Sequence, residues 1–272
     1  MASKAKTVKA HTNGKPAKVA MPDIVSVKAT LLGTTAMLLN PATEEILDII
    51  RKKAGGSKDR SKTREEEARE KLLMNSDKHL IIPTQYLLSA LVEAGRHVPF
   101  QGKSKISTRE NTLLYSFIFD YPEELVLTDG AGSPLIDSVR TSREAPDGCW
   151  WPDFRRGRNP SDKVMVALVR PRFENWALDI EFKIRTHITS TIGINPSKVR
   201  ELFEIAGAMV GLGDFRPSCR GPFGCYQVIK WETYGPDGVL LQSEGAKGEA
   251  EETPVADGVA ESEEEAVAVE AK

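Results

Sequence analysis

The stretch GAMVGLGDFRPSCRGPFGCYQVIKW, residues 207–231, contains the most specific pattern of the chain and predicts the last elements of its fold, namely the end of a helix, a loop and a strand. An apolar helical pattern stops at Gly211, and aromatic and β-branched residues from 225 to 231 predict a final strand. The loop between them contains Arg216 and Arg220, whose guanidinium groups stay charged, and glycines, which permit close backbone approach. We therefore expect N–H and guanidinium groups of this Gly/Arg loop to face an anion. Its four glycines are Gly211, Gly213, Gly221 and Gly224.

The hydrophobic patterns outside this loop predict an α+β fold with a ferredoxin-like core and large insertions. Their order is β-α-β-β-α-β, as in RNA-recognition modules, whose sheet binds nucleic acid across its open face. The core elements are a strand at 24–32, a helix at 84–97, strands at 113–120 and 175–185, a helix at 196–210 and a strand at 224–232. Further patterns predict helices at 43–53 and 63–74, extended pieces at 78–83, 124–128, 134–140 and 187–194, and a hairpin or two successive strands over 163–184.

Residues 122–163 form an insertion rich in Pro, Gly, Asp and Arg, too long for a plain loop and therefore a candidate functional excursion. It contains CWWPDFRRGR, residues 149–158. Aromatic faces that stack bases, next to cations that neutralise phosphates, suit single-strand binding. The alternative is that the tryptophans are buried while the arginines extend to solvent. The candidate binding residues are Trp150, Trp151, Arg155, Arg156 and Arg158.

Charge is segregated along the chain. Residues 1–22 contain five lysines and no acid, and residues 244–272 contain ten acids and two lysines. Both compositions predict disordered tails on either side of one domain, residues 23–243, whose net charge is about +1. The acidic tail is either a solvated tail or a mimic of nucleic acid that competes for the basic surface of the domain.

Several function classes lack their sequence signals. Three cysteines form no paired framework, which favours a reduced, cytoplasmic setting. No apolar run has the length of a membrane span, and no signal peptide opens the chain. Four scattered histidines show no metal-binding spacing, and neither a P-loop nor a nucleophile motif is present. We therefore expect no cofactor, no metal, no membrane partner and no catalytic residues.

Three segments resemble the RAMP superfamily of CRISPR effector complexes, especially the backbone subunits that line a guide RNA. They are VKATLLGTTAMLLN (27–40), LIIPTQYLLSALVEAGR (80–96) and AMVGLGDFRPSCRGPFGCYQV (208–228). The last is similar to the glycine-rich loop that precedes the final strand in that family. The resemblance implies binding of RNA or a single strand through this loop and the basic insertion, with side-by-side self-association. A stand-alone relative encoded by a phage or another mobile element fits equally.

The sequence thus predicts a non-catalytic protein that binds RNA or single-stranded DNA. One alternative is a protein-assembly component whose tryptophan insertion docks onto the next copy, and in that case the glycines simply serve a tight turn. Another is a metal-independent RNA endonuclease that uses His187 as general base, with Tyr115 or Lys183 nearby.

Overall fold

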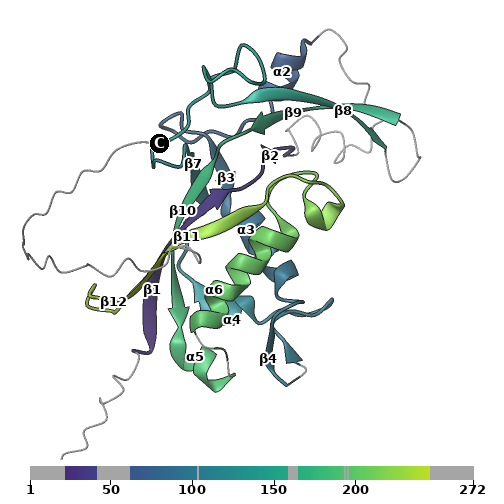
Figure 1. Ribbon diagram of the computed structural model, residues 1–272. Helices are drawn as coiled ribbons and strands as arrows, with labels where there is room; N and C mark the ends of the chain where they lie inside the picture. Colours follow the sequence, from purple (N-terminus) through teal and green to yellow (C-terminus); the bar gives the residue numbers. More distant parts are fainter. Residues whose placement is uncertain are drawn as a thin grey trace, which may run out of the picture.

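The computed structural model of the chain describes residues 22–41, 62–102, 104–158, 165–192, 194 and 196–245 (Figure 1). The predicted helix at 43–53 and nearly all of the two predicted tails lie outside these residues. The described part is a mixed α+β fold built on a mostly antiparallel sheet.

Seven strands form the main sheet, in the order β12-β11-β1-β10-β7-β3, and β6 also pairs with β10. Its pairings are antiparallel throughout. Three long strands lie at its centre, and the shorter ones lie toward its edges. The strands are β1 (Ile24–Gly33), β3 (Ile81–Pro83), β6 (Ile118–Phe119), β7 (Glu124–Thr128), β10 (Ala177–Arg185), β11 (Tyr226–Tyr234) and β12 (Leu240–Gly245).

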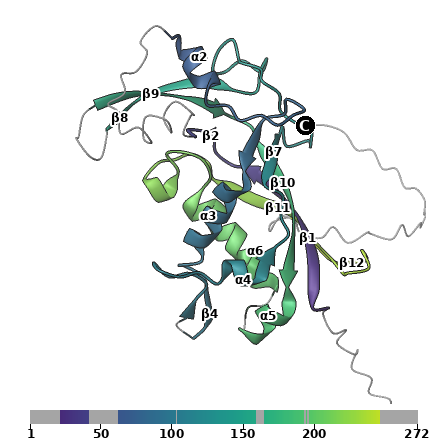
Figure 2. The same cartoon turned by 180° about the vertical axis from the view of Figure 1, so that it is seen from behind.

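One face of this sheet carries the core and is covered by helices α3 (Thr84–Ala94) and α6 (Pro196–Ile205) (Figures 1 and 2). Side chains alternate along β1, so that Val25, Val27 and Leu31 are fully buried beneath the helices. Toward α6, three aromatic rings pack together at centroid distances of 5.2 to 5.8 Å. They belong to Phe182 of β10, Phe203 of α6 and Trp231 of β11. After α6, a π-helical segment, η1 (Ala206–Val210), leads into the Gly/Arg loop.

A three-stranded ribbon projects beyond one end of the main sheet (Figure 1). Strand β9 runs directly into β10 of the main sheet through a corner at Trp176, which is buried and donates from Nε1 to the carbonyl of Thr35 at 2.9 Å. The ring lies so close to Gly33 that a Cβ there would be 2.4 Å from it. The ribbon consists of β2 (Met37–Leu38), β8 (Trp151–Arg158) and β9 (Met165–Phe173), and helix α2 (Arg64–Arg69) packs against it.

Two predicted elements are wrong in type. The segment predicted as a strand at 113–120 begins as helix α4 (Leu114–Phe117), because its buried residues Leu114 and Phe117 repeat at helical spacing. The predicted extended piece at 187–194 is mostly helix α5 (Thr186–Thr191). The hydroxyls of Thr189 and Thr191 donate to carbonyls one turn earlier, which is compatible with a helical backbone.

Other predictions need smaller corrections. Of the two alternatives for 163–184, the structure shows two successive strands, which belong to different sheets. The helix predicted at 63–74 spans only α2, which begins at a Thr63 capping box, and 134–140 forms only isolated bridges. Strand β12 extends to Gly245, past the predicted start of the acidic tail. The remaining elements are η2 (Pro217–Cys219), β4 (Pro99–Gln101) and β5 (Ser104–Lys105).

The close packing of η1 on β11 predicts that Gly207→Ala destabilises the protein. A Cβ at Gly207 would lie 2.2 Å from the carbonyl oxygen of Tyr226 and 2.8 Å from its ring, so backbone must shift. We expect a loss of about 1–3 kcal/mol in the free energy of unfolding, measured by urea denaturation. Gly245→Ala, where a Cβ meets nothing within 4 Å, is the matched control and should leave stability nearly unchanged.

Candidate nucleic-acid interface

The predicted Trp/Arg segment forms β8, the edge strand of the ribbon. Its side chains alternate between the two faces. Asp153 is buried and Arg155 half-buried on one face, whereas Phe154 and Arg156 are exposed on the other. Because β8 is an edge strand, residues from both of its faces border the space beside it.

Trp150 does not belong to this exposed surface. Its side chain is fully buried, and its indole Nε1 donates to Asp137 at 2.9 Å. The guanidinium of Arg69 lies 5.6 Å from the ring centroid. This packing leaves no ring face for a base, so we remove Trp150 from the candidate binding residues.

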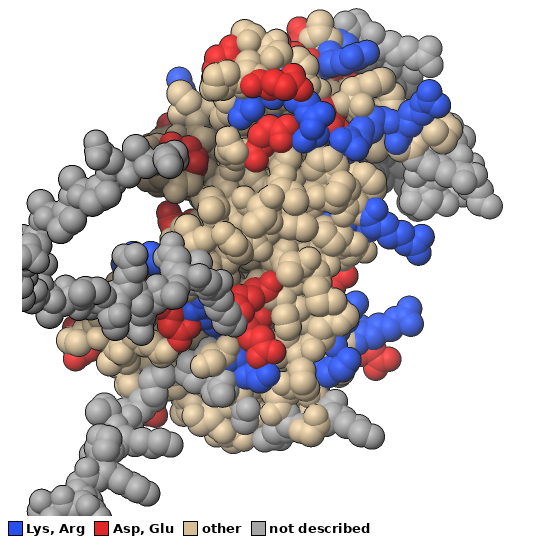
Figure 3. All heavy atoms as spheres, viewed as in Figure 1, with Lys and Arg blue, Asp and Glu red and all other residues tan. Residues whose placement is uncertain are grey.

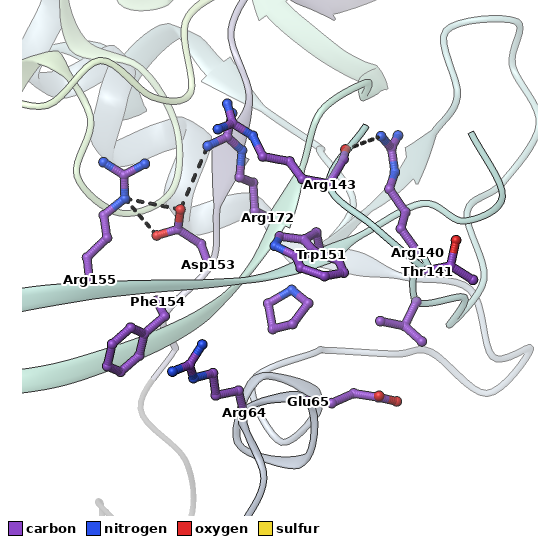
Figure 4. Close-up of a pocket in the computed structure, with 12 residues that line it drawn as sticks. Arg64, Glu65, Arg140, Thr141, Arg143, Trp151, Asp153, Phe154, Arg155 and Arg172 are labelled. Carbon is purple, nitrogen blue, oxygen red and sulfur yellow. Dashed lines mark hydrogen bonds and ion pairs between the residues drawn. The ribbon is translucent and has the colours of Figure 1, made fainter. Parts of the chain in front are cut away.

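A groove of about 880 Å³ lies beside β8 (Figure 4). Helix α2 borders one side, and the segment 139–143 borders another. Five arginines line the groove, against two carboxylates, Glu65 and Asp153. The arginines are Arg64, Arg140, Arg143, Arg155 and Arg172. Basic side chains, with acidic ones among them, are visible at this end of the molecule in Figure 3.

The arginines of the groove differ in how far internal carboxylates neutralise them. Arg172 is buried and pairs with Glu174 at 2.7 Å and Asp153 at 3.7 Å. Arg155 donates to Asp153 at 2.8 Å. Arg143, by contrast, is exposed and meets Glu174 only at 3.4 Å. The inner arginines are therefore fixed by ion pairs, and the outer ones retain donors for an anionic ligand.

The segment that carries Arg140 and Arg143 is held in shape by its own hydrogen bonds. Arg140 donates to the carbonyls of Gly148 at 3.0 Å and Arg143 at 3.3 Å. The backbone N–H of Thr141 donates to Asp147 at 3.1 Å. Hydrogen bonds from Thr141 hold the pKa of Asp147 below its usual value, and the charge of Arg140 adds to this. The loop therefore keeps its shape with Asp147 ionised.

Two aromatic side chains complete the groove. Trp151 is half-buried, and Phe154 is 47% exposed. The guanidinium of Arg64 lies over the Phe154 ring, 4.4 Å from its centroid. Flat faces next to cations are the features on which unpaired bases stack.

The structure brings the Gly/Arg loop against the ribbon. Phe223 of the loop lies near two guanidinium groups of the ribbon, those of Arg155 at 4.7 Å and Arg172 at 5.1 Å from its ring centroid. Arg170, which is buried, pairs with Asp214 of the loop at 2.7 Å. Two segments whose contacting residues are 44 to 68 positions apart in the sequence thus form one structural unit.

The glycines of the loop allow backbone segments to touch. A Cβ at Gly221 or Gly224 would lie 1.7 or 1.8 Å from a carbonyl oxygen of the same loop, and one at Gly213 would lie 2.3 Å from that of Leu38. Gly211 has a φ of 75° at the end of η1. The N–H groups of Leu212, Asp214 and Gly224 all donate to carbonyl oxygens within the protein. They are therefore not available to an anion, in contrast to our expectation from the sequence.

The cations of the loop and strand that we predicted lie in different places. Arg216 donates to the carbonyl of Gly213 at 3.1 Å and approaches Glu93 at 3.7 Å. Arg220 is exposed, with a left-handed φ of 63°. Arg156 points away from the face of Arg155, and the side chain of Arg158 lies outside what the structure describes. Among the predicted binding residues whose side chains the structure describes, Trp151 and Arg155 alone line the groove.

Sequence reasoning missed four of the groove arginines. Arg64 lies in a helix rich in charged residues of both signs, and Arg172 follows Pro171 in an apolar strand pattern, so neither residue stands out in the sequence. Arg140 and Arg143 lie in an irregular, Pro- and Gly-rich stretch whose path no periodicity reveals. The available signal was the count of arginines within and beside the insertion.

The open face of the main sheet does not offer such a surface. A shallow pocket of about 380 Å³ lies there, lined by charged residues of β1, β10 and β11. Their charges are paired with each other, Lys28 with Glu181 at 3.2 Å and Lys230 with Glu232 at 3.1 Å. Little cationic surface remains for a phosphate backbone, in contrast to the expectation from RNA-recognition modules.

Other site classes find no support in the described residues. These contain no group of three or more His, Cys, Asp or Glu side chains that could hold a metal. No helix among them is long and apolar enough to cross a membrane. The ring of His187 is exposed, with Nδ1 3.3 Å from the carbonyl of Asp23, and Lys183 pairs with Asp120 at 2.6 Å.

Comparison with known proteins finds similarity at the level of structure but not of sequence. No protein-family model matches the chain, and no curated protein matches its sequence. Among solved structures, it is similar to a chain of "Cryo-EM structure of the Type III-B Cmr-beta bound to cognate target RNA", with 12% identity and a TM-score of 0.40. The similarity covers 78% of this chain and 61% of that chain, so this chain spans about three-fifths of its length.

The ion pair between loop and ribbon predicts that Asp214→Ala destabilises the protein. Arg170 is 4% exposed, and its Nε already lacks a hydrogen-bond partner, so removal of Asp214 leaves a buried charge without its carboxylate. We expect the free energy of unfolding to fall by about 2 kcal/mol, less than for a fully buried pair because Asp214 is partly exposed. Asp179→Ala on the open face is the control, and an equal loss there would contradict the assignment.

Proposed function

We propose that this protein binds RNA or single-stranded DNA in the arginine-lined groove beside β8 and catalyses no reaction there. The observation that carries the proposal is the convergence of five arginines and two aromatic rings on one groove of about 880 Å³. The arginines come from α2, the 139–143 segment, β8 and β9, so the groove exists only in the folded protein.

The chemistry of the groove fits a polynucleotide better than an isolated anion. Guanidinium forks bind phosphate oxygens through paired, charge-assisted hydrogen bonds. Trp151 and Phe154 add ring faces, and each stacked base contributes about 1–3 kcal/mol. Bases in a duplex are already stacked on each other, so this contribution favours single strands.

We further propose that the fold is ferredoxin-like and RAMP-like, as the sequence resemblance implies. In support, the core strands lie side by side in the order β11, β1, β10 and β7. Counted along the chain, this is the order fourth, first, third, second. Strand β6 pairs with a different part of β10 than β7 does. Helices α3 and α6 follow the first and third strands and cover one face. The charges on the open face are paired with each other, so they are not free to bind phosphates. Nucleic acid therefore binds at the ribbon in this protein and not across the open face of the sheet. That a phage or another mobile element encodes this protein stays a prediction from the sequence.

A role in protein assembly is the second candidate, and the edge strand β12 favours it. Val239, Leu240 and Leu241 are 43 to 56% exposed along this edge. An exposed apolar edge strand is a template for pairing with another chain. Self-association of this protein through β12 is therefore the alternative, and its signature is a mass that grows with concentration when no nucleic acid is present.

Replacing the outer arginines should weaken binding and change its salt dependence. We expect Arg140→Ala with Arg143→Ala to lower the affinity for fluorescein-labelled U- or dT-oligonucleotides of about 20 nucleotides roughly tenfold. The slope of log K against log salt should become less steep by about 1.4, because each lost phosphate contact in a single strand contributes about 0.7. Anisotropy titrations between about 50 and about 200 mM salt measure both quantities.

The matched control removes two cations from the open face, Lys28→Ala with Lys230→Ala. This variant should bind as the wild type does. Equal weakening by the two double variants would show non-specific attraction and sink the groove assignment.

Replacing the exposed ring should weaken binding without changing the salt slope. Phe154→Ala removes a stacking face but no charge, so we expect an affinity loss of at least about fivefold, near the lower end for a stacked base because Arg64 already covers the ring. Met165→Ala, also exposed on the ribbon, is the control. A change of slope in Phe154→Ala, or no loss of affinity, would contradict stacking at this position.

A further inference from the structure

The chain leaves the described fold at a fixed point. Arg200 of α6 is 4% exposed and holds the end of β12. Its Nε donates to Glu204 at 3.1 Å, its Nη1 contacts Glu244, and its Nη2 donates to the carbonyl of Gly245 at 2.6 Å. Residues 246–272 therefore start from an anchored position at the sheet edge.

The direction of β12 brings this exit toward the groove end of the molecule. Gly245 stands opposite Lys230 of β11, and β11 starts at Tyr226, directly after the Gly/Arg loop. Lys230 and Phe223 are seven residues apart in the sequence, so at roughly 3.3 Å per extended residue at most about 23 Å separates them. Phe223 lies against Arg155 and Arg172 of the groove.

Residues 246–272 have the charge and the length to reach the groove. They contain nine acidic residues and two lysines, a net charge of −7, with Glu263, Glu264 and Glu265 in succession. A chain of 27 residues spans at most about 90 Å, which exceeds that distance severalfold. The distance along the sheet edge is therefore within its ordinary reach.

The groove already accepts carboxylates as partners. Arg155 binds Asp153, and Arg172 and Arg143 bind Glu174. With Glu174 counted beside Glu65 and Asp153, its five arginines still exceed its carboxylates by two charges. Guanidinium forks fit carboxylate and phosphate with the same paired geometry.

We propose that residues 246–272 occupy the arginine-lined groove and compete there with the nucleic acid. This inference rests on the proposed function for its regulatory meaning, whereas the contact itself is independent of it. The segment contains no aromatic residue, so it can satisfy the cations but cannot use the ring faces of Trp151 and Phe154. A polynucleotide contacts both the arginines and the two rings, so it displaces the segment. An anionic ligand that binds only weakly to the arginines does not displace it.

The first test uses the full chain with three glutamates of the acidic run neutralised, Glu263→Gln, Glu264→Gln and Glu265→Gln. We expect this variant to bind the labelled U-oligonucleotide about fivefold more tightly at about 50 mM salt, given the size of exposed ion pairs. The difference should shrink at about 200 mM salt as screening increases. The matched control neutralises three exposed glutamates outside the groove lining, Glu110, Glu123 and Glu124. Equal tightening by the control would overturn the proposal, because it would show only a change in net charge.

The second test needs no nucleic acid. A fluorescein-labelled peptide of residues 246–272 is titrated with the glutamate-neutralised full chain. We expect salt-dependent binding that Arg140→Ala with Arg143→Ala weakens about tenfold or more, and that Phe154→Ala leaves unchanged. Absence of peptide binding, or binding lost only when the lysines of residues 1–22 are replaced, would overturn the proposal.

The two tests separate this inference from the proposed function. Binding of the peptide at the groove, without binding of either the U- or the dT-oligonucleotide, would overturn the proposed function and uphold the internal contact. Binding of the oligonucleotides, with no effect of the glutamate substitutions and no peptide binding, would uphold the proposed function and overturn this inference.

Discussion

The ion pair between Arg170 and Asp214 joins the ribbon to the Gly/Arg loop, and the shape of the groove depends on this contact. Arg170 lies on β9 with almost no exposure, and Asp214 lies on the Gly/Arg loop. Around this pair, Phe223 packs beneath the guanidinium groups of Arg155 and Arg172. The loop is therefore the support of the ribbon, and the groove depends on the ribbon staying in place.

Local patterns predicted most of the fold, and they failed where periodicity is ambiguous. Strands with clear alternation, such as β1, and helices with a continuous apolar stripe, such as α3, were predicted correctly. The prediction of a strand at 113–120 was wrong at its start because a short apolar segment is compatible with either a strand or a helical turn. The ribbon was missed as a separate sheet because pairing between β8 and β9 depends on partners that a single segment does not reveal.

The candidate site was predictable in kind but only partly in position. The co-occurrence of tryptophan and arginine in 149–158 indicated Arg155 and Trp151 as candidate binding residues, and both line the groove. The same pattern could not show that Trp150 points into the core, because the two neighbouring tryptophans lie on opposite faces of the chain. Arg64 lies more than seventy residues before Arg140 and Arg143 in the sequence, and only the tertiary fold brings these residues to one groove.

The corner at Trp176 determines how the ribbon meets a ligand. The indole is buried, bonded to Thr35 and in contact with Gly33, and β9 passes through this corner into the centre of the sheet. A ribbon held by a packed corner cannot swing freely, so the walls of the groove are in place before a ligand arrives. Association then requires little ordering of the backbone, and differences in affinity among ligands should appear mainly in their residence times.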